Sequence, residues 1–168
     1  AVNEDAGAQT VGTVLSPFAT RDEGGGSDEN SQTLTTTVTN NNNSLFSVQP
    51  AISAAGVLTY TPALNKVGTA TVTIRVDDDG GTVDSGVNTV STTFAITVNA
   101  INDAPTVTLG SAPAVNEDAG AQTVGTVLSP FATTTKGGGS DENSQTLTTT
   151  VTNNNNSLFS VQPDIDDD

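Results

Sequence analysis

Cysteine, methionine, histidine and tryptophan are all absent from this chain. Without cysteine there is no disulfide framework and no thiolate metal site. Without histidine there is no ordinary zinc site and no histidine-based catalytic triad. A domain of this composition must therefore be stabilised without disulfides, and we expect a β-core.

Basic residues are also scarce, because four of them face nineteen acidic residues and leave a net charge of -15. Nucleic acids attract clustered Lys and Arg, so no nucleic-acid partner is expected, and an anionic membrane surface is equally unattractive. The chain has no stretch of about 18 apolar residues, so direct membrane insertion is not expected either. A chain with this charge is expected to attract cations, which relieve its self-repulsion.

An internal repeat is the dominant feature that the sequence does contain. Residues 2–50 match residues 115–163 at 46 of 49 positions, with an offset of 113. The three differences are Arg21, Asp22 and Glu23, which become Thr134, Thr135 and Lys136. A period of this length suits one β-sandwich domain of about 100 residues plus a junction. Near-identity predicts recent duplication within a longer array, with an engineered duplication as the alternative.

The repeat predicts three regions along the chain. Residues 1–103 would form one complete repeat, and residues 104–114 a junction with the first strand of the next. Residues 115–168 would form a partial second repeat with an acidic tail. The chain begins at Ala1 without a basic-then-apolar segment, which predicts an excised or processed piece without a signal peptide.

Short segments rich in Thr and Val predict strands rather than helices. The clearest segment is 70–76, where Ala70, Val72 and Ile74 fall on one face, as in a half-buried antiparallel strand. We predict strands at residues 11–15, 33–39, 45–48, 57–61, 70–76 and 92–98. The predicted fold class is all-β: an Ig-like or cadherin-like antiparallel β-sandwich, repeated in tandem, with an incomplete second copy.

The second copy has no counterpart of the strands predicted at 70–76 and 92–98. Half a sandwich exposes unpaired strand edges and an apolar face. Three outcomes are open for it. It is disordered, it is the first part of a longer chain, or it completes itself with strands from a neighbouring molecule. The last outcome would make the protein a self-assembling fibre subunit.

Acidic residues gather in the predicted loops and at the predicted strand ends. The densest group is the run of Asp77, Asp78 and Asp79, which precedes two glycines. Ca²⁺ takes six to eight oxygen ligands from carboxylates, amides and backbone carbonyls, so such loops are candidate calcium sites. The alternative is a solvated hairpin turn. No EF-hand loop pattern is present, so no single segment is expected to bind the ion alone.

Several motifs carry a resemblance to a known family. The segment Asn102-Asp103-Ala104-Pro105 resembles the Asn-Asp-x-x-Pro-type linker that closes each cadherin repeat, and Val115-Asn116-Glu117-Asp118 resembles the acidic segment of such a repeat. Arg75-Val76-Asp77-Asp78-Asp79-Gly80 is similar to the loop before the last strand. In combination the chain resembles the bacterial cadherin-like, tandem-95-type Ig-like repeats of large surface adhesins, over nearly all of residues 1–163.

This resemblance implies Ca²⁺ as the cofactor, bound at repeat junctions. The metal ligands that it implies, together with the acidic segment of the second copy, are Glu4, Asp5, Asp28, Glu29, Asp77, Asp78, Asp79, Asn102, Asp103, Glu117, Asp118, Asp141, Glu142 and Asn143. The Asp-Arg-Glu segment of true cadherins has no counterpart near residues 64–68. The second copy also lacks a counterpart of Asp77, Asp78 and Asp79.

The expected function is mechanical and not enzymatic. The resemblance implies an extracellular spacer or stalk on a bacterial cell surface, stiffened by Ca²⁺, whose partners are neighbouring repeats or identical chains in a fibre. A glycan- or protein-binding module is a second alternative. Paired carboxylates could hydrolyse glycosides in principle, but the chain has only Tyr60 and five Phe as aromatic residues, and it has no nucleophile motif.

Overall fold

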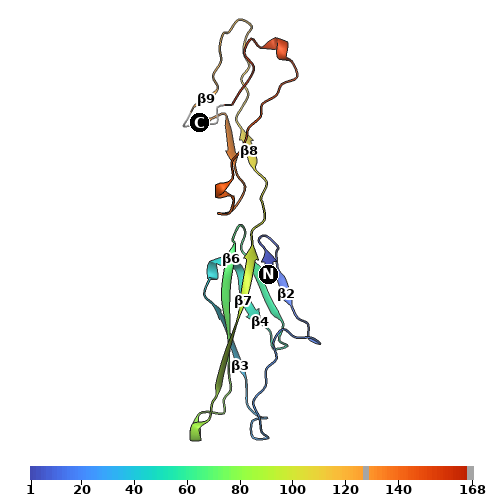
Figure 1. Cartoon of the computed structure of the whole chain (residues 1–168), viewed down its shortest axis with the longest axis vertical. Coiled ribbons are helices and arrows are strands. Elements are labelled where there is room, and N and C mark those ends of the chain that lie inside the picture. Colours follow the sequence, from blue (N-terminus) through green and yellow to red (C-terminus); the bar gives the residue numbers. More distant parts are fainter. Residues whose placement is uncertain (127–128, 166–168) are drawn as a thin grey trace. The chain divides into compact units, whose positions relative to one another are not determined.

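The structure is a computed structural model that describes residues 1–126 and 129–165 (Figure 1). This part of the chain is all-β, as predicted, and its helical elements are short 3₁₀ turns at Asn43–Leu45, Val83–Ser85, Glu142–Ser144 and Asn156–Leu158. No helix in it is long and apolar enough to cross a membrane. The chain divides into two compact units. The first is Ala1–Ile101 with Gly139–Asp141, and the second is Asn102–Gly138 with Glu142–Asp168.

The first unit contains a mixed four-stranded sheet. Its strands, in spatial order, are β1 (Val2–Asn3), β7 (Thr89–Asn99), β6 (Gly68–Asp77) and β3 (Thr35–Asn40). The long strands β6 and β7 run antiparallel along their lengths, and β3 pairs antiparallel with the other side of β6 (Figure 1). β1 runs parallel to β7, with Val2 opposite Val98. The expectation of purely antiparallel pairing is therefore wrong for this edge strand.

A second sheet in the same unit has three antiparallel strands. β5 (Leu58–Pro62) lies between β2 (Gln9–Val11) and β4 (Phe46–Ile52). The pairing of β4 with β5 shifts register twice, between Phe46 and Val48 and between Val48 and Ala51. Such irregularities bend a strand locally.

One buried cluster joins the two sheets of the first unit. Its members are Leu45, Phe46, Leu58, Tyr60, Ala70, Val72, Ile96 and Val98, with Val2, Val38, Ile52 and Phe94 packed against it. The alternation predicted for β6 is confirmed, because Ala70, Val72 and Ile74 are buried and the residues between them are not. Full burial of one such aliphatic side chain contributes about 1.5–3 kcal/mol, so this cluster holds the unit together.

The predicted strands at 33–39, 57–61, 70–76 and 92–98 are confirmed within a few residues. The strand predicted at 11–15 is wrong, because β2 ends at Val11 and the chain turns immediately afterwards. Gly12 has φ +85° and forms an isolated bridge with Pro17. The strand predicted at 45–48 begins one residue later and is longer, since Leu45 ends a 3₁₀ turn and β4 continues to Ile52.

The second unit contains most of the second copy, residues 115–163, but its strands pair differently from those of the first unit. β8 (Thr106–Leu109) pairs antiparallel with β11 (Ala132–Thr135), and β9 (Gly125–Thr126) pairs with β10 (Ser129–Pro130). The counterparts of β3 and β4, at 148–153 and 159–165, are not strands. Leu158 and Phe159 are 70% and 39% exposed, whereas Leu45 and Phe46 are 1% and 5% exposed.

Candidate metal-binding site

Glu4 is an acidic side chain held inside the first unit. It follows β1, and its backbone N–H donates to the carbonyl of Asn99 at 2.9 Å. Its carboxylate oxygen Oε1 accepts a hydrogen bond from the N–H of Ile101 at 2.8 Å. The residue is only 3% exposed, and its second oxygen, Oε2, has no hydrogen-bond partner within the described chain. Backbone pairing of β1 with β7 therefore places one half-satisfied carboxylate in the interior.

The surroundings of Glu4 disfavour its negative charge. Burial is the largest cause that raises the pKa of this carboxyl above its ordinary value. The hydrogen bond from Ile101 lowers the pKa in part, whereas the nearby carboxylates of Asp141 and Asp5 raise it. A buried acceptor without a donor costs about 1–3 kcal/mol, and more when it is charged. A positive charge at this position would remove the penalty.

Two further acidic residues of the first unit belong to this neighbourhood. Asp141 comes from the segment Gly139–Asp141, and its Oδ1 atom is buried without a partner in the described residues. Asp5 adopts φ +59°, and its Oδ1 atom accepts a hydrogen bond from the N–H of Asn65 at 2.9 Å. Glu4 and Asp141 therefore supply two unsatisfied carboxylate oxygens within one unit.

The second unit holds its own buried acid. Glu142 is 2% exposed, and its Oε1 atom accepts a hydrogen bond from the N–H of Asp103 at 2.9 Å. Its Oε2 atom is buried and finds no partner in the described parts of the chain. Asp103 in turn accepts a hydrogen bond from the N–H of Gly138 at 3.2 Å. Gly137 is at φ +107°, and a side chain there would clash with Asp103, since its Cβ would lie 2.7 Å from the Asp103 Cβ.

Two other candidates in this unit are already engaged. The amide oxygen of Asn102 accepts a hydrogen bond from Gln145 Nε2 at 2.8 Å. The backbone carbonyl of Asn143 accepts one from Lys136 Nζ at 2.9 Å. Among the carboxylates described in this unit, Glu142 is the buried one that keeps an oxygen without a partner.

The run of Asp77, Asp78 and Asp79 makes hydrogen bonds and an ion pair with other residues of the first unit. Asp77 forms an ion pair with Arg75 at 2.6 Å, and Asp78 Oδ1 accepts the N–H of Gly80 at 2.9 Å. Asp79 Oδ1 accepts the N–H of Thr33 at 2.7 Å. These carboxylates therefore close the loop after β6 and attach it to the segment before β3.

The remaining predicted ligands are not gathered into a site. Asp28 is exposed, and Glu29 is half-buried and accepts a hydrogen bond from Gln32. Glu117 and Asp118 are exposed, although they repeat the local sequence of Glu4 and Asp5. Within residues 1–126 and 129–165, no three acidic side chains form a group that could hold a metal ion. Any bound ion would need backbone carbonyls, amides and water besides the carboxylates, and Ca²⁺ accepts all of these.

Sequence reasoning identified Glu4 and Glu142 as candidates but not their burial. Their local sequences occur twice, and only one copy of each is buried, so no local signal could separate them. The backbone donors of Ile101 and Asp103 were also missed, because any non-proline residue carries an N–H. Only the pairing of the strands decides which N–H faces a carboxylate.

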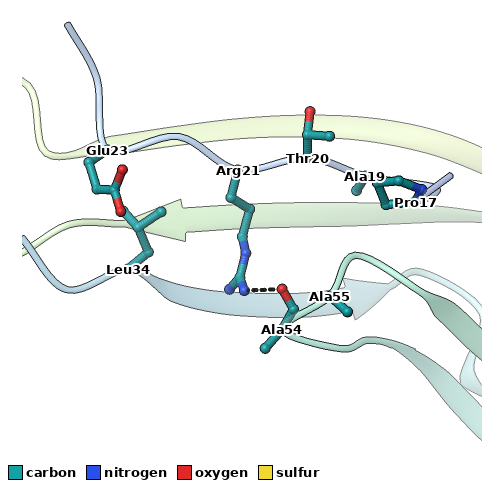
Figure 2. A pocket seen from close by; sticks show the side chains of 8 residues that line it. All are labelled: Pro17, Ala19, Thr20, Arg21, Glu23, Leu34, Ala54 and Ala55. Atoms are coloured by element: carbon teal, nitrogen blue, oxygen red, sulfur yellow. Dashed lines mark hydrogen bonds between the residues drawn. The ribbon is translucent and has the colours of Figure 1, made fainter. Parts of the chain in front are cut away.

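A shallow pocket of about 360 Å³ lies elsewhere in the first unit (Figure 2). It is lined by Pro17, Ala19, Thr20, Arg21, Glu23, Leu34, Ala54 and Ala55. Arg21, its only basic lining residue, donates to Thr36 Oγ1 and to the carbonyl of Ala54, both at 2.7 Å. The guanidinium group therefore ties the segment before β3 to the turn after β4.

Comparison with protein-family models, curated proteins and solved structures finds no match to this chain. Its function is therefore inferred from the geometry of the carboxylates and from the motifs of the sequence.

Proposed function

We propose that this chain is a calcium-rigidified structural repeat of a bacterial extracellular adhesin or surface fibre, which acts as a spacer or stalk. The observation that carries the proposal is Glu4, a residue only 3% exposed whose carboxylate has one oxygen that no donor reaches in the described structure. Asp141 adds a second unsatisfied oxygen in the same unit. The resemblance of the loop and linker motifs to cadherin-like repeats adds the bacterial-surface setting.

The donor set favours Ca²⁺ among common biological cations. Every candidate ligand is an oxygen atom, because the chain has neither cysteine nor histidine. Hard cations prefer oxygen, and Ca²⁺ tolerates an irregular set of carboxylates, carbonyls and waters. Mg²⁺ demands near-ideal octahedral geometry and releases its waters reluctantly, so it suits a site with few carboxylates less well.

The chain connectivity gives such an ion a mechanical role. Asp141 clusters with the first unit, while the residues on both sides of Gly139–Asp141 belong to the second unit. A cation shared by Glu4 and Asp141 would hold this segment on the first unit. Removal of the cation would leave two carboxylates that repel each other. We therefore infer that Ca²⁺ restrains neighbouring repeats of the same protein and stiffens an extended array.

The substitution Glu4→Gln tests this proposal, because its effect on the free energy of unfolding should have opposite signs without and with Ca²⁺. Without Ca²⁺ the amide keeps the acceptor for Ile101, removes the buried charge and offers a donor to Asp141, so the free energy of unfolding rises. With Ca²⁺ the wild type gains about 2.7 kcal/mol at a concentration one hundred times the Kd, and the variant loses most of that gain. Thermal unfolding in Ca²⁺ and in chelator measures both effects.

Glu117→Gln is the matched control, because residue 117 has the same neighbours in sequence but an exposed side chain. We expect it to leave both unfolding curves unchanged. An equal Ca²⁺ effect in the wild type and in Glu4→Gln would contradict the proposed site. An unchanged wild-type curve in Ca²⁺ and chelator would remove the ion from the function.

A further inference from the structure

The core of the first unit is formed by two parts of the chain, of which one is repeated in the sequence and the other is not. Residues 51–101 supply most of the buried cluster from β5, β6 and β7, and they occur once. Residues 2–50 supply Leu45 and Phe46, with Val2 and Val38 packed beside them. This second part recurs as residues 115–163. The surface formed by residues 51–101, called here the acceptor face, therefore has two nearly identical segments in the chain that fit it.

Several apolar side chains of the second segment are exposed. The counterparts of Val2, Leu45 and Phe46 are Val115, Leu158 and Phe159, which are 55%, 70% and 39% exposed. Within residues 2–50, strands β1, β2, β3 and β4 pair with β5, β6 and β7. Every residue of residues 2–50 that takes part in this pairing is identical in the second copy. Each backbone pair and each core contact of that segment can thus be made again by residues 115–163.

We propose that the acceptor face of one copy of this chain binds residues 115–163 of a second copy, in place of its own residues 2–50. In this exchange Val151 would take the position of Val38 opposite Ile74, and Thr152 that of Thr39 opposite Thr73. The released residues 2–50 leave the same kind of segment free, so a chain of exchanges can continue from copy to copy.

The second unit's own contacts indicate that the partner is another molecule. In the exchange, Glu142 would take the position of Glu29, close to Thr33 and Asp79 at the far end of β6. That end lies about 30 Å from the Gly68–Val98 pair, because nine residues of strand separate Gly68 from Asp77. Within one chain, Asp103 follows Val98 by five residues, which span at most about 18 Å. Exchange within one chain would therefore break the Asp103–Glu142 hydrogen bond, whereas exchange between two chains keeps it.

One contact favours the unexchanged pairing. Arg21 donates to the carbonyl of Ala54 at 2.7 Å, across the boundary between the two parts, and its counterpart is Thr134. The direct peptide bond between residues 50 and 51 also keeps residues 2–50 close to the acceptor face. The exchanged population should therefore rise with protein concentration and with loss of the Arg21 contact.

The absence of cysteine from the chain makes disulfide trapping a clean test. In the test, Thr73→Cys and Thr152→Cys are introduced together into the full chain. The protein is then oxidised in the presence of chelator over a range of protein concentrations. We expect covalent dimers and larger ladders whose yield rises with concentration. Thr73→Cys with Thr39→Cys is the positive control and should close within one chain, because these residues are paired in β6 and β3.

An off-register pair separates specific exchange from random collision. Thr148 is as exposed as Thr152, but its counterpart Thr35 pairs with Asp77, four residues from Thr73. Thr73→Cys with Thr148→Cys should therefore give far less dimer. Adding Arg21→Thr to Thr73→Cys with Thr152→Cys removes the hydrogen bond from Arg21 to Ala54. The dimer yield should then rise roughly fivefold, because the net contribution of one hydrogen bond changes an equilibrium constant by about that factor.

Three results would overturn the inference. The first is an equal dimer yield for Thr73→Cys with Thr152→Cys and for Thr73→Cys with Thr148→Cys. The second is a disulfide within one chain in place of the dimer. The third is no disulfide between residues 73 and 152 under conditions in which residues 73 and 39 are fully cross-linked. Because chelator is present throughout, a negative result here leaves the calcium proposal standing. The reverse also holds, since dimers would form whether or not Ca²⁺ stabilises the chain.

Discussion

Residues 2–50 and 115–163 share 46 of 49 residues, but among the residues that the structure describes only the first copy contributes to the buried cluster. The segment TTTVTN forms β3 at Thr35–Asn40, whereas the same letters at 148–153 form no strand. Both copies keep the 3₁₀ turn that ends at Leu45 or Leu158, with nearly the same dihedral angles at the preceding Asn. Short-range structure therefore follows local sequence, while strand formation follows the presence of a partner strand.

The largest expected contrast between the copies comes from removal of a leucine. Leu45→Ala should lower the free energy of unfolding by about 2–5 kcal/mol, because the side chain is 1% exposed and its loss leaves a cavity. Leu158→Ala, at 70% exposure, should change it by less than about 0.5 kcal/mol. Denaturant unfolding of both variants measures the contrast. Equal losses would show that the second copy has a core of its own.

Both copies have a glycine with positive φ at the same place, and substitution of either glycine should have a similar effect. Gly12 and Gly125 have φ of +85° and +92°, and a Cβ would lie 2.5 Å and 2.4 Å from the next phenylalanine's amide nitrogen. Alanine at either position should therefore cost about 1–3 kcal/mol of local strain. Rates of chymotrypsin cleavage after Phe18 and after Phe131, in the folded protein, monitor each turn separately. Loss of protection in the first copy alone would show that the turn in the second copy is held differently.

The burial of Glu4 in the first copy should make stability depend on pH. The folded pKa of Glu4 is raised above 4.5, so the native state binds more protons than the unfolded state between 4.5 and the raised pKa. The free energy of unfolding therefore falls as pH rises through that window, and this contribution is fully present only below it. In chelator, the advantage of Glu4→Gln over the wild type should grow across the same window. Urea titrations of the wild type and of Glu4→Gln at a series of pH values measure this trend, and a constant difference between them would contradict it.

The smallest expected effect concerns the positions where the copies differ. Arg21→Thr, measured in dilute solution, should lower the stability of the first unit by about 1 kcal/mol, since it removes the hydrogen bonds to Thr36 and Ala54. The reciprocal change, Thr134→Arg, should leave thermal stability in dilute solution within about 0.5 kcal/mol. A larger loss for Thr134→Arg would mean that Thr134 in β11 makes a contact that arginine cannot replace.

Much of the fold was predictable from residue patterns. The alternation of Ala70, Val72 and Ile74 located β6, and the Thr-rich segment before Asn40 located β3, because a half-buried strand requires a period of two. β1 could not be predicted, since two residues carry no period and its parallel pairing depends on β7. The site was predictable as residue types only. Glu4 and Glu117 have the same neighbours, so their different burial has no local cause.

By itself the sequence determined the chemistry of this protein: an excess of negative charge, oxygen donors in place of sulfur and imidazole, a β-forming composition and one segment written twice. For residues that occur in both copies, only the tertiary structure decided which of the two is buried. The physical reason is that a strand is stabilised by its neighbours, through ladder hydrogen bonds and shared apolar area. Residues 51–101 provide those neighbours for the first copy, and the same arrangement leaves Glu4 with a carboxylate oxygen that a cation would satisfy.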